Sequence, residues 1–172
     1  MSLATVLGLV VSLVAVVATV AVGALRFRHE RKLADIADAR SILAEGVLEL
    51  GRMKSVMKDA LTKFEQPLTG RGEWPSDSLD EIRKLELAAE NLESALAAVR
   101  IRFQHDSDVV TQLEGAYDAA RSVITVYGLA NGTEADDDHS DYAEALMLGT
   151  NFDSRKDIYL ITAQNAVGVQ LY

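Results

Sequence analysis

Apolar residues follow three successive patterns along the chain, and the first is a run without any charged side chain. In residues 3–25, thirteen of the twenty-three residues are Val or Leu. As a helix this run would be about 34 Å long, enough to cross a hydrocarbon core of roughly 30 Å. It is longer than the apolar stretch of a secretion signal, and no Lys or Arg precedes it. We therefore expect a transmembrane anchor over residues 1–25, with a cleaved signal as the alternative.

A heptad pattern follows the uncharged run, over residues 26–66. Large apolar side chains recur every seven positions: Ile36, Leu43, Leu50, Met57 and Phe64. Small or flexible residues come three positions after the first four of them: Ala39, Gly46, Met53 and Ala60. Small companions suit a neighbouring helix that approaches closely, and no proline interrupts this region. The pattern predicts that the anchor continues into a first long helix.

Residues 67–78 read as a turn, because Pro67, Gly70, Gly72 and Pro75 fall within it. A third pattern begins after this turn and runs through residues 79–129. Its apolar positions alternate three and four apart: Ile82, Leu85, Ala89, Leu92, Leu96, Val99 and Phe103, then Val110, Leu113, Tyr117, Ala120, Ile124 and Tyr127. Ser78 and Glu81 have the spacing of a capping box, which places Ser78 as the cap of this second long helix.

Helix length favours a break within this second stretch. About 40 residues separate the predicted membrane surface from the turn, which is about 60 Å of helix. An unbroken return helix of residues 79–129 would overshoot that distance, so we expect it to break near residues 105–108, where Asp106 or Ser107 can cap a third helix. The predicted fold is all-α: a single N-terminal transmembrane helix continuing into an antiparallel helical hairpin or a three- to four-helix bundle with heptad packing.

The remaining chain reads as an acidic loop over residues 130–141 and a C-terminal helical segment over residues 142–172. Ser140 or Asp141 is the expected cap of a short helix, and Asp153 or Ser154 that of a last one. Residues 156–172 are ambiguous, because their apolar runs also fit a short strand hairpin. Helix is the favoured interpretation.

Charge is distributed unevenly around these elements. The chain has a net charge of −9; residues 26–66 carry nine Lys or Arg against seven acids, and residues 67–172 carry eight against nineteen. The acidic distal part is typical of a solvated, bacterial-type surface and argues against nucleic-acid binding. A basic collar of Arg26, Arg28, Arg31 and Lys32 follows the anchor. The positive-inside rule then places the N-terminus outside and the C-terminal body in the cytoplasm of a single-pass cell-membrane protein.

Two sequence features suggest contacts with other chains. Small residues recur along one face of the anchor with spacings of three or four, which suits helix association in a membrane: Ala4, Gly8, Ser12, Ala15, Thr19 and Gly23. The single tryptophan, Trp74, lies in the turn. It is expected to fold back over the tip of the hairpin, and docking of a protein partner is the alternative.

Candidate chemistry is sparse. Asp136, Asp138 and Asp141 cluster in the acidic loop and are weak candidates for a hard cation, but the loop does not fit an EF-hand. The chain has no cysteine, which excludes thiolate sites, and it has no phosphate loop or hydrolase motif. We therefore expect neither a cofactor nor an enzymatic activity.

The leading hypothesis is a membrane-anchored helical scaffold or adaptor that docks a protein partner still to be identified, as a homo-oligomer. The alternative is a membrane-tethered sensory or ligand-binding helical bundle, which requires polar groups inside the bundle; Asp106 on the apolar seam is the hint for it. The arrangement of anchor and long helix is similar to that of the peripheral-stalk subunit b of ATP synthases. The turn at residues 67–75 and the acidic loop depart from that continuous stalk, so no family is assigned.

Overall fold

The computed structural model describes the backbone of residues 3–69, 72–103, 107–132 and 140–167, and side chains from residue 19 onward except those of residues 132, 140 and 141. These residues form four helices and no strand, which confirms the all-α prediction. The helices are α1 (Leu3–Leu68), α2 (Ser78–Arg102), α3 (Asp108–Gly132) and α4 (Ser140–Val167). The chain divides into two compact units, residues 1–39 and residues 40–172.

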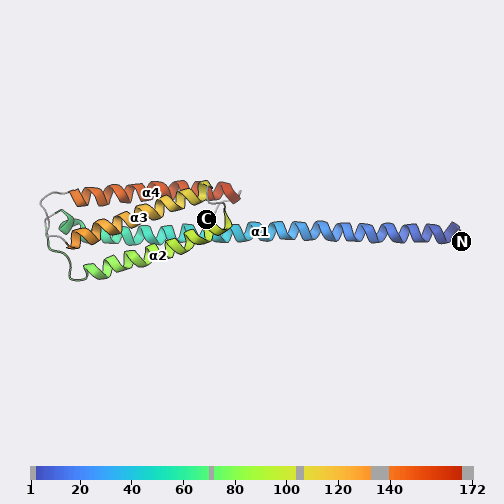
Figure 1. Cartoon of the computed structure of the whole chain (residues 1–172), viewed down its shortest axis with the longest axis horizontal. Helices are drawn as coiled ribbons and strands as arrows, with labels where there is room; N and C mark the ends of the chain where they lie inside the picture. Colours follow the sequence, from blue (N-terminus) through green and yellow to red (C-terminus); the bar gives the residue numbers. More distant parts are fainter. Residues whose placement is uncertain (1–2, 70–71, 104–106, 133–139, 168–172) are drawn as a thin grey trace. The chain divides into compact units, whose positions relative to one another are not determined.

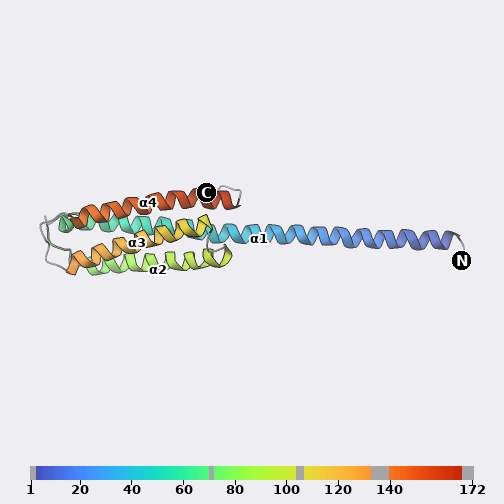
Figure 2. The same ribbon diagram turned by 45° about the horizontal axis from the view of Figure 1, so that its top comes forward.

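The second unit is an antiparallel bundle built from the C-terminal part of α1 together with α2, α3 and α4. Successive helices run in opposite directions, and both views show them side by side (Figures 1 and 2). The heptad seam of α1 lies in the core: Leu43, Leu50, Met53, Ala60 and Phe64 are almost fully buried. Ile36, the first member of the predicted seam, lies in the first unit and is exposed. The helical-bundle prediction is therefore confirmed for residues 40–167 as far as they are described.

Aromatic rings fill the end of the bundle at which α1 meets the turn. The Phe64 ring lies 5.0 Å from the Trp74 ring and 5.3 Å from the Tyr127 ring, measured between centroids. Tilted and edge-on arrangements of this kind are favourable beyond the area that they bury. Trp74 is half-buried in this cluster, so its ring packs back over the bundle end, and its docking role stays a prediction.

The start of α2 differs from the predicted capping box. Asp77 is the residue before the helix, and its carbonyl accepts the Glu81 N–H at 3.1 Å, while its side chain makes no capping hydrogen bond. Ser78 is instead the first residue of α2 and is buried, and its hydroxyl donates to Asn131 Oδ1 at 3.1 Å. The prediction that Ser78 caps α2 is wrong, because a partner on α3 takes its hydroxyl.

The other helix boundaries also refine the sequence interpretation. α1 continues through Pro67 to Leu68, since a proline in the last turn removes only one hydrogen bond of the helix. Ser107 Oγ accepts the Val110 N–H at 3.4 Å at the start of α3. The prediction of two short C-terminal helices is wrong, because α4 is one helix from Ser140 to Val167. No proline interrupts it. Residues 156–167 are part of this helix, so the strand alternative does not hold for them.

Gly46 on α1 lies directly against Tyr159 on α4. A Cβ added to Gly46 would overlap with the hydroxyl of Tyr159, which is fully buried and donates to the Leu43 carbonyl oxygen at 3.4 Å. The α1 backbone thus forms a notch into which the end of the tyrosine ring fits. Farther along the same helix pair, Lys54 Nζ lies 2.8 Å from Asp153 Oδ1.

Gly46→Ala should destabilise the bundle, although alanine is the better helix former. Overpacking against a fully buried side chain costs about 1–3 kcal/mol, offset in part by about 1 kcal/mol of helix propensity. Gly51→Ala is the matched control, because nothing lies within 4 Å of its added Cβ, and it should stabilise by about 1 kcal/mol. Denaturant unfolding of the full chain measures both changes. Equal stability of the two variants would contradict the notch.

Acid should remove the contribution that Glu81 makes to the free energy of unfolding. This buried carboxylate pairs with Lys63 on α1, and also with Lys84 at 2.8 Å. The hydrogen bond from Lys63, followed by that from Lys84, lowers the pKa of Glu81 below its ordinary value of 4.5. Because the folded-state pKa is the lower one, the contribution is present above the unfolded pKa and is lost as pH falls through the folded value.

Glu81→Gln should therefore flatten the decline in the free energy of unfolding between about pH 6 and about pH 3. Glu86→Gln, an exposed position on the same helix, is the control and should keep the wild-type decline. Urea titrations at several pH values give these curves. The account of this pair fails if the two variants show the same pH dependence.

Candidate functional site

The predicted basic collar lies on α1 in the first unit. Arg26, Arg28, Arg31 and Lys32 are all exposed. The Arg31 guanidinium lies 4.3 Å from the centroid of the Phe27 ring, which is itself exposed. Stacking of this kind leaves the charge accessible while it covers part of an apolar ring.

The predicted association stripe is described only at its C-terminal end. Thr19 and Gly23 are exposed, and nothing lies within 4 Å of a Cβ added to Gly23. Gly8, Ser12 and Ala15 lie outside the described side chains, as does most of the predicted anchor. Among the helical residues whose side chains the structure describes, no stretch is long and apolar enough to cross a membrane.

The weak metal candidates fall outside what the structure describes. Asp136 and Asp138 lie in residues 133–139, the side chain of Asp141 is also outside, and so is Asp106, the polar residue expected on the seam. Across the described part of the chain, no three His, Cys, Asp or Glu side chains gather as a metal site would require.

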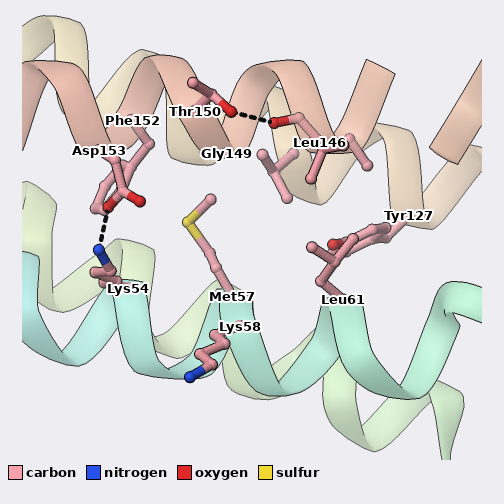
Figure 3. Close-up of a pocket in the computed structure, with 12 residues that line it drawn as sticks. Lys54, Met57, Lys58, Leu61, Tyr127, Leu146, Gly149, Thr150, Phe152 and Asp153 are labelled. Carbon is pink, nitrogen blue, oxygen red and sulfur yellow. Dashed lines mark hydrogen bonds and ion pairs between the residues drawn. The ribbon is translucent and has the colours of Figure 1, made fainter. Parts of the chain in front are cut away.

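A pocket in the bundle gathers more candidate chemistry than any of these predicted residues. It lies between α1, α3 and α4 and has a volume of about 200 Å³. α1 contributes Lys54, Met57, Lys58 and Leu61, and α3 contributes Val123 and Tyr127. The α4 wall consists of residues between Ala145 and Asp153 (Figure 3). Most of these side chains are apolar, as in typical small-molecule sites.

Small residues on α4 create this space. Gly149 faces the pocket, and nothing lies within 4 Å of a Cβ built on it. Ala145, one helical turn before it, is buried and adds only a methyl group. On the opposite wall Met57 points from α1 toward α4 (Figure 3). The gap therefore exists because α4 presents small side chains at this level of the bundle.

Most polar groups in the lining are already engaged. Lys54 Nζ and Asp153 Oδ1 form the 2.8 Å ion pair at one end, and this hydrogen bond is the main cause that raises the pKa of Lys54. Thr150 Oγ1 donates to the Leu146 carbonyl oxygen at 2.9 Å. The ammonium group of Lys58 points away from α4 (Figure 3). The interior of the pocket therefore faces no uncompensated charge from these residues.

Tyr127 contributes a hydroxyl group to the lining from α3. Its side chain is only 1% exposed, and its hydroxyl forms no hydrogen bond with any residue that the structure describes. Burial, followed by the nearby Tyr142, raises the pKa of Tyr127, so the group stays protonated. Figure 3 shows the hydroxyl at the end of the ring that faces the middle of the pocket. The open donor of this hydroxyl marks where the acceptor group of a ligand would bind.

Sequence reasoning placed Tyr127 on the apolar seam and did not identify the pocket. The seam assignment is correct, because the ring packs on Phe64 in the core. The heptad pattern, however, predicts only the face of the helix on which a side chain lies. It does not predict whether the hydroxyl of that side chain forms a hydrogen bond. Gly149 was the available signal, because it lies inside a helical segment. Glycine in a helix costs about 1 kcal/mol relative to alanine, so its presence often has a packing or functional reason.

Comparisons with family models, with curated proteins and with solved structures find no match for the chain.

Proposed function

We propose that the chain is a single-pass, membrane-anchored helical scaffold that docks a protein partner as an oligomer, with its bundle in the cytoplasm. The uncharged stretch of residues 3–25 carries this proposal. A helix that is apolar on all sides is typical of a membrane span. Support also comes from Val20, Val22 and Leu25, which lie on different sides of α1 and are all exposed. The basic collar follows within one turn and supports the orientation.

A second copy of the chain is the partner that the surface of α4 favours. Six exposed, uncharged residues are spaced four and three apart along α4 and define the α4 outer seam: Met147, Asn151, Ser154, Ile158, Ile161 and Asn165. In a chain with a net charge of −9, a face without charge can meet its own copy without repulsion. With this spacing, Asn151 and Asn165 occupy a positions of a heptad. Asparagine at an a position of a parallel coiled coil fixes the register and favours two strands. This face therefore supports a parallel dimer.

A second candidate function is a ligand-binding or sensory bundle. The pocket between α1, α3 and α4, with the unpaired hydroxyl of Tyr127, is the observation that favours it. The two candidates are compatible, since the α4 outer seam and the pocket lining use different residues of α4.

Charge in the anchor should release the chain from membranes. Each Arg near the centre of a span costs about 2.5–3.5 kcal/mol on insertion scales. Leu13→Arg/Val17→Arg should therefore move the chain from the membrane pellet to the supernatant after alkaline carbonate extraction. Leu48→Arg/Leu87→Arg, at two exposed leucines of the bundle, should remain in the pellet. Release of the wild-type chain would contradict the anchor.

Orientation is tested separately with a reporter that is active only in the cytoplasm. Fused to the C-terminus it should be active, and a silent fusion beside an active N-terminal fusion would reverse the topology. Replacing Arg26, Arg28, Arg31 and Lys32 with Asn should lower the activity of the C-terminal fusion, because it removes the retained positive charge.

Acids placed in the α4 outer seam should convert a dimer into a monomer. Ile158→Asp/Ile161→Asp brings like charges together across a two-fold interface, a cost of several kcal/mol. Leu87→Asp/Ile101→Asp, at exposed positions on α2, is the control and should stay dimeric. Native mass spectrometry from lipid nanodiscs reads the mass of the assembly. A monomeric wild type would contradict the proposed oligomer. If only Gly8→Leu/Ala15→Leu loses the dimer, the dimer contact lies in the predicted association stripe of the anchor and not in the α4 outer seam.

A further inference from the structure

We infer that the pocket between α1, α3 and α4 binds a small, neutral, mostly apolar molecule whose hydrogen-bond acceptor pairs with the hydroxyl of Tyr127. This deepens the second candidate function and rests on it alone; the anchor and the α4 outer seam can each fail without affecting it. Three properties of the pocket carry the inference: its size, its charge and the hydroxyl of Tyr127, which forms no hydrogen bond with the described residues.

Size limits the ligand. Sites for drug-sized ligands have volumes of about 300–1,000 Å³, and an apolar cavity of about 150 Å³ is sufficient for benzene. At about 200 Å³ the pocket fits a molecule of roughly one ring with a short substituent. Phe152 and Met57 supply polarisable surface against which a planar ring packs well.

Charge excludes an ion as the preferred occupant. The ammonium of Lys54 already pairs with Asp153, and the hydroxyl of Thr150 already donates within α4. A carboxylate or ammonium ligand would have to leave water for a mostly apolar pocket in which Lys54 and Asp153 already pair and the ammonium of Lys58 points away from α4, which is costly. A neutral molecule avoids that cost.

The hydroxyl of Tyr127 specifies the polar group. Because its pKa is raised by burial, the hydroxyl keeps its proton and acts as a donor. The matching group is an acceptor such as a carbonyl oxygen on the end of the ligand that reaches the α3 wall. A bound acceptor gives this donor a partner inside the pocket, which adds the net free energy of about one hydrogen bond to binding.

A pair of isosteric probes isolates that hydrogen bond. Acetophenone carries a carbonyl where α-methylstyrene carries a methylene group, and the two have nearly the same shape. The full chain in nanodiscs is labelled with ¹³C on the methyl groups of its four methionines. The Met57 methyl lines the pocket and should shift on titration, whereas the exposed Met147 methyl should not.

The decisive quantity is the ratio of the Kd of α-methylstyrene to the Kd of acetophenone. Tyr127→Phe should lower this ratio by about two- to tenfold, the change that one net hydrogen bond gives. The difference between the two probes in hydration and in partition into lipid is the same for both proteins, so it cancels when the ratio in Tyr127→Phe is compared with the ratio in the wild type. An unchanged ratio in a folded variant, with both probes still shifting Met57, overturns the acceptor assignment while the pocket remains a binding site.

A volume change tests the pocket itself. Gly149→Leu should fill the space and weaken both probes at least tenfold. Gly128→Leu is the matched control, since that helical glycine is also free of neighbours within 4 Å but is exposed outside the pocket, and it should keep wild-type affinities. If neither probe shifts the Met57 methyl of the wild type, both this inference and the ligand-binding function are overturned.

Discussion

The close approach of α1 and α4 is the constraint on which the bundle depends. At Gly46 the α1 backbone lacks a side chain, and Tyr159 occupies that place with its hydroxyl on the Leu43 carbonyl. A bulky ring in a notch fixes how far one helix slides along the other, because any shift by one residue brings the ring against a side chain. The ion pair of Lys54 and Asp153 follows from the same register and adds little by itself, since both side chains are partly exposed.

The pocket is the counterpart of that notch. At Gly46 a small residue on α1 faces a large one on α4, whereas at Gly149 a small residue on α4 faces Met57 without filling the gap. A bound molecule of the right shape would fill this space and add packing contacts that the free bundle lacks. Membrane anchoring, dimerisation and ligand binding are compatible on this view, because they use different faces of the chain.

The sequence predicted the parts of the fold that depend on periodicity. The seven-residue repeat correctly placed Leu43, Leu50 and Phe64 in the core, since burial follows the face of the helix. The sequence was less informative where a residue distant in the chain determines the hydrogen bond that a side chain makes. Ser78 has the spacing of a cap, yet its hydroxyl is taken by Asn131, fifty-three residues away. Pro67 signals a break but is tolerated in the last turn of α1.

The candidate site shows the same limit. Tyr127 was correctly placed on the seam, but a heptad pattern does not distinguish a tyrosine whose hydroxyl is satisfied, such as Tyr159, from one whose hydroxyl faces a gap. That difference arises from the residues of α1 and α4 that happen to lie opposite each ring. It becomes visible only when the helices are assembled.

The most direct test of this account is an experimental structure of the full chain with acetophenone bound. The account predicts the ring between Met57 and Gly149 and the carbonyl oxygen about 2.5–3.0 Å from the Tyr127 hydroxyl oxygen. A structure in which side chains close the gap at Gly149, with Tyr127 hydrogen-bonded to another residue and the ketone absent, would contradict it.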